Sequence, residues 1–153
     1  MANSVLEHQP ADSGTPLEGL RVFPVETGRD QKRFLQLPWK LYAGDENWIP
    51  PLRQNQKEMV NYSPHPFYDD NIIQTFLATI NDEPVGRIAA LVNYAHNRRY
   101  KENRGFVGFF ESIDNQQVAN GLFAAASDWL VQQGMTAARP DESFHEPRMW
   151  PTH

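Results

Sequence analysis

The chain has 153 residues, of which 40% are hydrophobic and 12% aromatic, and its formal net charge is −5 at pH 7. This length accommodates one domain with a sizeable core, and the aromatic content is typical of a globular chain rather than a disordered one. The acidic balance argues against nucleic acid as a partner, because phosphate binding requires clustered Lys and Arg. The one basic stretch, 98–101, ends at Glu102.

Cysteine is absent, which excludes disulfides, thiolate zinc sites and a thiol nucleophile. No apolar stretch approaches the roughly 20 residues that a membrane-spanning helix requires. Residues 1–19 lack the basic start and apolar core of a secretory signal, so we expect them to form a flexible lead-in. The protein is therefore expected to be cytoplasmic and to make no membrane contact. His65 and His96 fall in expected loops without the spacing of metal ligands, so no metal site is expected.

The first periodic segment, 20–26, alternates apolar and polar residues over part of its length, as a strand does. Pro24 has no N–H for a second neighbouring strand, so this strand is expected at a sheet edge. Residues 27–30 offer helix-capping side chains, and 31–37 is expected to be helical. We expect Pro38 to break that helix, because proline lacks an N–H and its ring clashes with the preceding turn.

A second short helical piece is then expected, ending near Gly44. The following stretch, 45–68, is rich in proline and aromatic residues. A loop of this length in a compact domain is usually functional or contains a helix of its own, and 52–60 is the candidate for that helix.

The centre of the sequence predicts an antiparallel hairpin. Residues 72–80 and 85–93 have the apolar character of strands, and 81–84 (Asn-Asp-Glu-Pro) has the composition of a turn. A polar connection, 96–104, leads to a third apolar strand at 105–111, in which Phe106, Phe109 and Phe110 are expected to lie in the core.

The longest expected helix follows, over 114–133. Asp114 is expected to cap its N-terminus, with Gln117 three residues later as in a capping box. Apolar residues at 118, 122, 125, 126 and 129 recur at helical spacing, and Gly134 stands where a glycine commonly ends a helix.

The order of these elements is that of the first half of the GNAT fold, the fold of acyl-CoA N-acyltransferases. The fold class is therefore expected to be α+β, a mostly antiparallel sheet with flanking helices. Residues 20–139 resemble a bacterial family of GNAT-like proteins of poorly characterised function. Four stretches carry the resemblance: FLQLPWKLY at 34–42, WIPPL at 48–52, VGRIAA at 85–90 and GFVGFFE at 105–111.

The resemblance implies an acyl-CoA site where the fourth strand meets the following helix. In GNAT enzymes this strand splays from the fifth, and its free backbone amides hold the acyl-CoA, whose pyrophosphate lies on the helix N-terminus. Acetyl-CoA or another acyl-CoA would then be held mainly by backbone amides, and Glu111 could act as general base toward a small-molecule amine. The residues at the positions expected to hold the cofactor are Phe110, Glu111, Ser112, Ile113, Asn115, Gln116 and Gln117.

Other interpretations of these residues remain open. The GNAT loop before the helix usually reads Gln/Arg-x-x-Gly-x-Gly/Ala, whereas 112–119 contains no glycine or arginine and would place the Asp114 carboxylate at the cap. This departure favours a non-catalytic ligand-binding or interaction domain as the alternative function. Glu111 could be a solvent-facing carboxylate at a strand end. Arg87 could counter a phosphate or carboxylate, or form a surface ion pair.

The last segment, 140–153, shows no periodicity where the fifth strand of the fold is expected. Suitable codons for it, translated one base out of register, give PTNPSMNHECGLL, which resembles the family at this point. We hypothesise that 140–153 is a disordered, out-of-frame tail and that 20–139 is a partial GNAT-like domain truncated before its fifth strand. On this hypothesis the chain is an inactive remnant of an acyltransferase, and its fourth strand has an unpaired edge.

Overall fold

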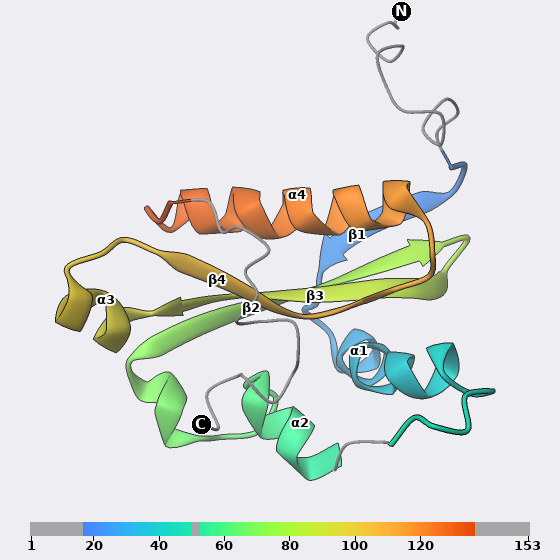
Figure 1. Cartoon of the computed structure of the whole chain (residues 1–153), viewed down its shortest axis with the longest axis horizontal. Helices are drawn as coiled ribbons and strands as arrows, with labels where there is room; N and C mark the ends of the chain where they lie inside the picture. Colours follow the sequence, from blue (N-terminus) through green and yellow to red (C-terminus); the bar gives the residue numbers. More distant parts are fainter. Residues whose placement is uncertain (1–16, 50–52, 137–153) are drawn as a thin grey trace, which may run out of the picture.

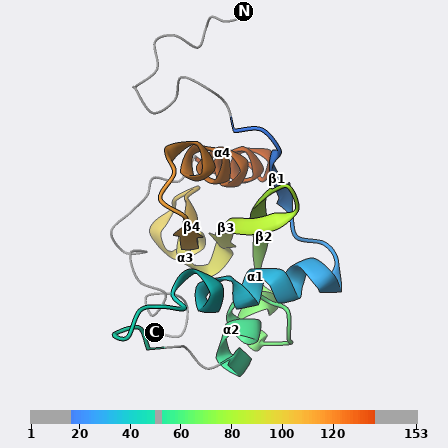
Figure 2. The same ribbon diagram turned by 90° about the vertical axis from the view of Figure 1, so that its right-hand side faces the viewer.

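The computed structural model describes residues 17–49 and 53–136. Four strands form one antiparallel sheet in the order β1-β2-β3-β4, namely β1 (Leu20–Pro24), β2 (Asn71–Ile80), β3 (Glu83–Asn93) and β4 (Gly105–Ser112). Helices lie on both faces, with α4 (Gln116–Gln132) on one face and α1 (Gly28–Leu41) and α2 (Arg53–Met59) on the other (Figures 1 and 2). The expected α+β class is confirmed. Within the described residues, no helix combines the length and apolar character needed to cross a membrane.

The sheet separates two apolar cores, because successive side chains of a strand point to opposite faces. On one face, Ile88 and Ala90 of β3 pack under α4, whose residues Val118, Leu122 and Leu130 are fully buried. On the other face, Leu77 of β2 and residues of β3 and β4 pack against Phe34 of α1. The two faces therefore have separate helix layers.

Several elements lie where the sequence predicts them. β1 is an edge strand that pairs only with β2, as Pro24 requires. β2 and β3 form the expected hairpin, and Asn81 and Asp82 of its turn have positive φ angles of 51° and 71°. Gly134 follows α4 with a φ of 82°, a conformation that glycine adopts without steric cost. The helix expected over 52–60 is α2.

The prediction that Pro38 breaks the first helix is wrong. Pro38 is buried within α1, and the helix continues until Tyr42, whose N–H donates to the Pro38 carbonyl at 2.9 Å. A proline in a helix leaves the carbonyl four residues earlier without its N–H partner. Here that carbonyl belongs to Phe34, and a side chain from the sheet supplies the missing donor, as described below.

A further helix lies where the sequence predicted only a polar connection. α3 (Tyr94–Tyr100) begins after Asn93, whose side chain accepts a hydrogen bond from the N–H of His96. It ends at Lys101, which has a φ of 55°. A seven-residue helix with two adjacent arginines has no apolar stripe to reveal it, so its polar composition concealed the capped turn.

β4 carries an irregularity close to the predicted site. Arg87 of β3 pairs with Glu111, but Ala89 pairs with Gly108, so two residues of β4 stand opposite one residue of β3. Phe109 lies in this bulge with a φ of 55°, a rare conformation for an aromatic residue. A bulge bends its strand and redirects the side chains that follow. The ladder is therefore interrupted at Phe109 and Phe110 and resumes at Glu111, which pairs with Arg87 directly after the bulge.

After α4, the chain returns to lie beside the start of β4. Thr136 forms a parallel bridge with Arg104, and its N–H donates to the Asn103 carbonyl at 2.7 Å. The expected tail, 140–153, and the hypothesis that it is out of frame lie outside the described residues.

Candidate functional site

The centre of the candidate site is the half-buried carboxylate of Glu111 near the end of β4. The hydroxyl of Tyr42, which follows the last residue of α1, donates to its Oε1 at 2.5 Å. This hydrogen bond is the main cause that raises the pKa of Tyr42 to about 12, and partial burial and the negative charge of Glu111 add to it. Tyr42 therefore keeps its proton at neutral pH, and the carboxylate is the acceptor. The interpretation of Glu111 as a merely solvent-facing group does not fit this contact.

Arg87 lies opposite Glu111 on β3, and the interpretation as a surface ion pair is wrong. Its side chain is 1% exposed. The guanidinium lies 4.8 Å from the ring centre of Phe34 and 5.6 Å from that of Phe109, as in cation–π contacts. Burial lowers the pKa of Arg87 to about 10, whereas the charge of Glu111 acts in the opposite direction. Arg87 thus remains a cation at neutral pH and contributes positive potential beside Glu111.

The same guanidinium explains how α1 accommodates its proline. Nη1 of Arg87 donates to the Phe34 carbonyl at 2.9 Å, the carbonyl that Pro38 leaves without an N–H. The hydrogen bond joins the middle of α1 to β3. Because Tyr42 lies one turn beyond Pro38, this anchor holds the tyrosine within reach of Glu111.

The residues expected to bind a cofactor are brought together at the junction of β4 and α4, but several of their amides are already used. The N–H of Ile113 donates to the Val85 carbonyl at 2.9 Å, and that of Asn115 to the Ile113 carbonyl at 2.7 Å. The side chain of Asn115 caps α4 by accepting from the N–H groups of Gln117 and Val118 at 2.8 and 3.2 Å. These bonds leave fewer amides for a pyrophosphate than an open helix N-terminus offers.

Two expectations at this junction are wrong. Asp114 is exposed and does not cap α4; Asn115 does. Phe110 is not a core residue, since it is 38% exposed and packs on Phe123 of α4 with ring centres 4.8 Å apart. Phe109 is buried as expected, whereas Phe106 is half-buried. The side-chain hydroxyl of Ser112 donates to the Ile113 carbonyl at 2.5 Å.

Tyr42 is the functional candidate that sequence reasoning missed. It is 69 residues from Glu111, and no local spacing connects the two. The available signal was indirect, namely that a helix continuing through Pro38 would carry Tyr42 to the end of the sheet.

Comparisons with known proteins agree with this geometry at the level of the fold. No family model matches the chain. A bacterial ceramide synthase of Caulobacter vibrioides is 40% identical over 121 residues, which cover 78% of this chain and 31% of that protein. A tandem GNAT protein from the clavulanic acid biosynthesis pathway superposes with a TM-score of 0.59 at 13% identity, over 84% of this chain and 40% of that one. An aminoglycoside acetyltransferase from an uncultured soil metagenomic sample, in complex with sisomicin, gives a TM-score of 0.56 at 15% identity, over 81% and 79% of the two chains.

The described part of the chain therefore has a GNAT-like fold, and the expected resemblance is confirmed. Its sequence is homologous in part to the bacterial ceramide synthase, of which it spans about a third of the length.

Proposed function

We propose that this chain contributes to an acyltransferase that moves an acyl group from acyl-CoA to an amine. The observation that carries the proposal is the Glu111 carboxylate, held by Tyr42 directly after the bulge of β4. The GNAT-like fold supports it, as does the name of the ceramide synthase relative, because ceramide formation is the acylation of an amine.

Glu111 would act as the general base in this reaction. The amine nitrogen attacks the thioester carbonyl carbon, and the carboxylate takes the proton that the nitrogen loses. Tyr42 occupies Oε1, and the described residues place no hydrogen-bond donor on Oε2, so that oxygen would receive the proton. The carbon–sulfur bond then breaks, and the thiolate of CoA leaves and is protonated by solvent.

The residues around Glu111 would prepare the carboxylate for this role. Arg87, the cross-strand partner of Glu111, is a buried cation that would place positive potential beside the carboxylate. Backbone N–H groups near the end of β4 would stabilise the negative charge that develops on the thioester oxygen.

A second candidate function is a non-catalytic ligand-binding or interaction domain. Asn115 favours it, because its side chain already occupies two amides at the N-terminus of α4. In an acyl-CoA site these amides would face the pyrophosphate.

Calorimetric titration of the full chain with acetyl-CoA separates the two functions. Micromolar binding with release of heat supports the acyltransferase, and the Glu111→Gln variant should bind as tightly because the base contacts the amine and not the cofactor. In a protein that turns over, the same substitution should lower kcat by about 10²- to 10⁴-fold, the usual contribution of a general base. Absence of acetyl-CoA binding would favour the non-catalytic domain.

A further inference from the structure

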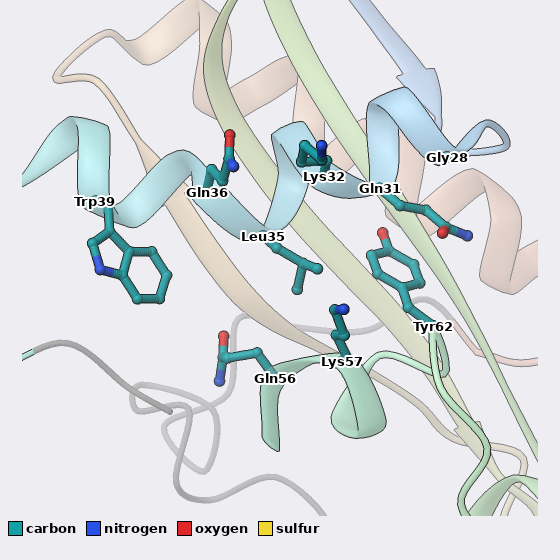
Figure 3. A pocket seen from close by; sticks show the side chains of 9 residues that line it. All are labelled: Gly28, Gln31, Lys32, Leu35, Gln36, Trp39, Gln56, Lys57 and Tyr62. Atoms are coloured by element: carbon teal, nitrogen blue, oxygen red, sulfur yellow. The ribbon is translucent and has the colours of Figure 1, made fainter. Parts of the chain in front are cut away.

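A pocket of about 350 Å³ lies between α1 and α2, and Glu111 is not among the residues that line it. Gly28, Lys32, Leu35 and Trp39 of α1 line it, and their spacing of three or four residues places them on one flank of the helix. Phe34 and Leu37 of α1 are buried in other directions. Figure 3 shows Leu35 of α1 and Lys57 of α2 extending toward each other across the pocket.

The ionised side chains that line this pocket are both cationic. Lys32 belongs to α1 and Lys57 to α2, so the two charges come from opposite walls. Among residues 17–49 and 53–136, neither lysine forms an ion pair with a carboxylate. The pocket is therefore locally positive, whereas the chain as a whole has a net charge of −5. Such a pocket attracts an anion and repels an ammonium group, which separates it from any site for an amine acceptor.

Polar groups in the pocket also have unused hydrogen-bonding capacity. Gln56 is 4% exposed, and the described partner of its Nε2 is the thioether sulfur of Met59 at 4.0 Å, a weak acceptor. A buried amide normally makes stronger hydrogen bonds than this. Gln31 and Gln36 of α1 add two further amides to the wall.

The remaining walls are apolar. Leu35 and Trp39 of α1 contribute one side, and the ring of Tyr62 contributes another. The hydroxyl of Tyr62 is paired with that of Thr75 at 2.6 Å, so its ring is fixed in place. The volume lies at the lower end of the range for small-molecule sites.

We propose that this pocket binds a small organic anion, with a phosphate or carboxylate group between Lys32 and Lys57 and a flat apolar body against Leu35 and Trp39. The amide of Gln56 donates to the ligand. The site is separate from the acyl-CoA site proposed above and does not depend on it.

Titration of the full ¹⁵N-labelled chain with phenyl phosphate tests this proposal, with the indole N–H of Trp39 and the side-chain amide of Gln56 as reporters in NMR spectra. Both signals should shift saturably. Inorganic phosphate supplies only the anionic group and benzyl alcohol only the aromatic ring, so each should bind at least 10-fold more weakly than phenyl phosphate. The double variant Lys32→Gln/Lys57→Gln should weaken phenyl phosphate about 10-fold, since each exposed charged contact is worth about a factor of three.

The matched control is Arg98→Gln/Lys101→Gln, which removes the same charge from two exposed cations outside the pocket and should leave the affinity unchanged. Equal weakening in the two double variants would show that only net charge matters and would overturn the proposal. Equally tight binding of benzyl alcohol would do the same. Displacement of phenyl phosphate by acetyl-CoA would assign the pocket to the cofactor and refute a separate site.

Discussion

The contact between Arg87 and the Phe34 carbonyl makes a quantitative prediction about two residues that do not pair directly. Arg87→Met should destabilise the protein, because it removes the donor that replaces the missing N–H of Pro38. Pro38→Ala restores that N–H, which can then donate to the Phe34 carbonyl within α1. The cost of Arg87→Met should therefore be smaller in the Pro38→Ala background than in the native one.

The magnitude follows from the buried carbonyl. A hydrogen bond from a charged donor contributes about 1.5–3 kcal/mol, and a buried acceptor left unsatisfied costs about 1–3 kcal/mol. Loss of the contacts with Phe34 and Phe109 adds about 1 kcal/mol. Release of a charge that is only 1% exposed offsets part of this loss. We expect a net cost of about 2 kcal/mol for Arg87→Met, with about 1–2 kcal/mol of it recovered when residue 38 is alanine.

Urea unfolding of the native chain, the two single variants and the double variant measures this coupling. Volume lost at Pro38 affects both backgrounds equally and cancels in the cycle. Gln36→Ala, an exposed substitution on the same helix, is the control and should be additive with Arg87→Met. If the effects at 87 and 38 add within about 0.3 kcal/mol, the guanidinium does not serve the carbonyl that proline leaves free.

Three further predictions concern the rest of the site. Tyr42 should titrate near pH 12 in ¹³C NMR of its ring; its raised pKa means that the stabilisation from its bond to Glu111 is complete below pH 10 and is lost as the pH rises toward 12. Glu111→Gln should lower this midpoint, because it removes the hydrogen bond to a carboxylate, which is the main cause of the raised pKa, together with the negative charge that opposes ionisation. Asn115→Ala should cost about 1 kcal/mol in urea unfolding, as loss of a helix cap does. Gly86→Ala should cost about 1–3 kcal/mol through overpacking, since a Cβ would lie 2.8 Å from Leu122 Cδ1 and 3.0 Å from Val118 Cγ1.

Each of these predictions has a matched control. Asp114→Ala should change the free energy of unfolding by less than about 0.5 kcal/mol. An effect as large as that of Asn115→Ala would indicate that Asp114, and not Asn115, caps α4. Gly44→Ala meets no atom within 4 Å and should be neutral, so an equal loss there would remove the packing explanation for Gly86. An unchanged Tyr42 midpoint in Glu111→Gln would contradict the Tyr42–Glu111 pair.

The sequence predicted the sheet because its signals are local. The hairpin of β2 and β3 follows from two apolar runs joined by turn residues, and the edge position of β1 follows from Pro24. The same kind of signal located α4 and its terminal Gly134, while the choice between adjacent Asp114 and Asn115 as cap depended on backbone geometry that composition does not specify.

The sequence failed where distant residues decide the outcome. Local rules predict that Pro38 ends a helix, but Arg87, 53 residues from Phe34, supplies the donor that lets α1 continue. The burial of Arg87 could not be predicted from the strand sequence, because its partner, the Phe34 carbonyl, belongs to a distant helix. Tyr42 reaches Glu111 only because this helix is uninterrupted. The contact between Arg87 and the Phe34 carbonyl therefore accounts both for the wrong prediction at Pro38 and for the failure to predict the role of Tyr42.

The central claim, that the end of β4 and the start of α4 form an acyl-CoA site, is tested most directly by mapping where acetyl-CoA binds. ¹H–¹⁵N spectra of the full chain, recorded during titration with acetyl-CoA, should show saturable shifts at the backbone amides of 110–117, with the reporters of the α1–α2 pocket unchanged. Spectra in which the amides of 110–117 do not move at saturating acetyl-CoA would contradict the claim.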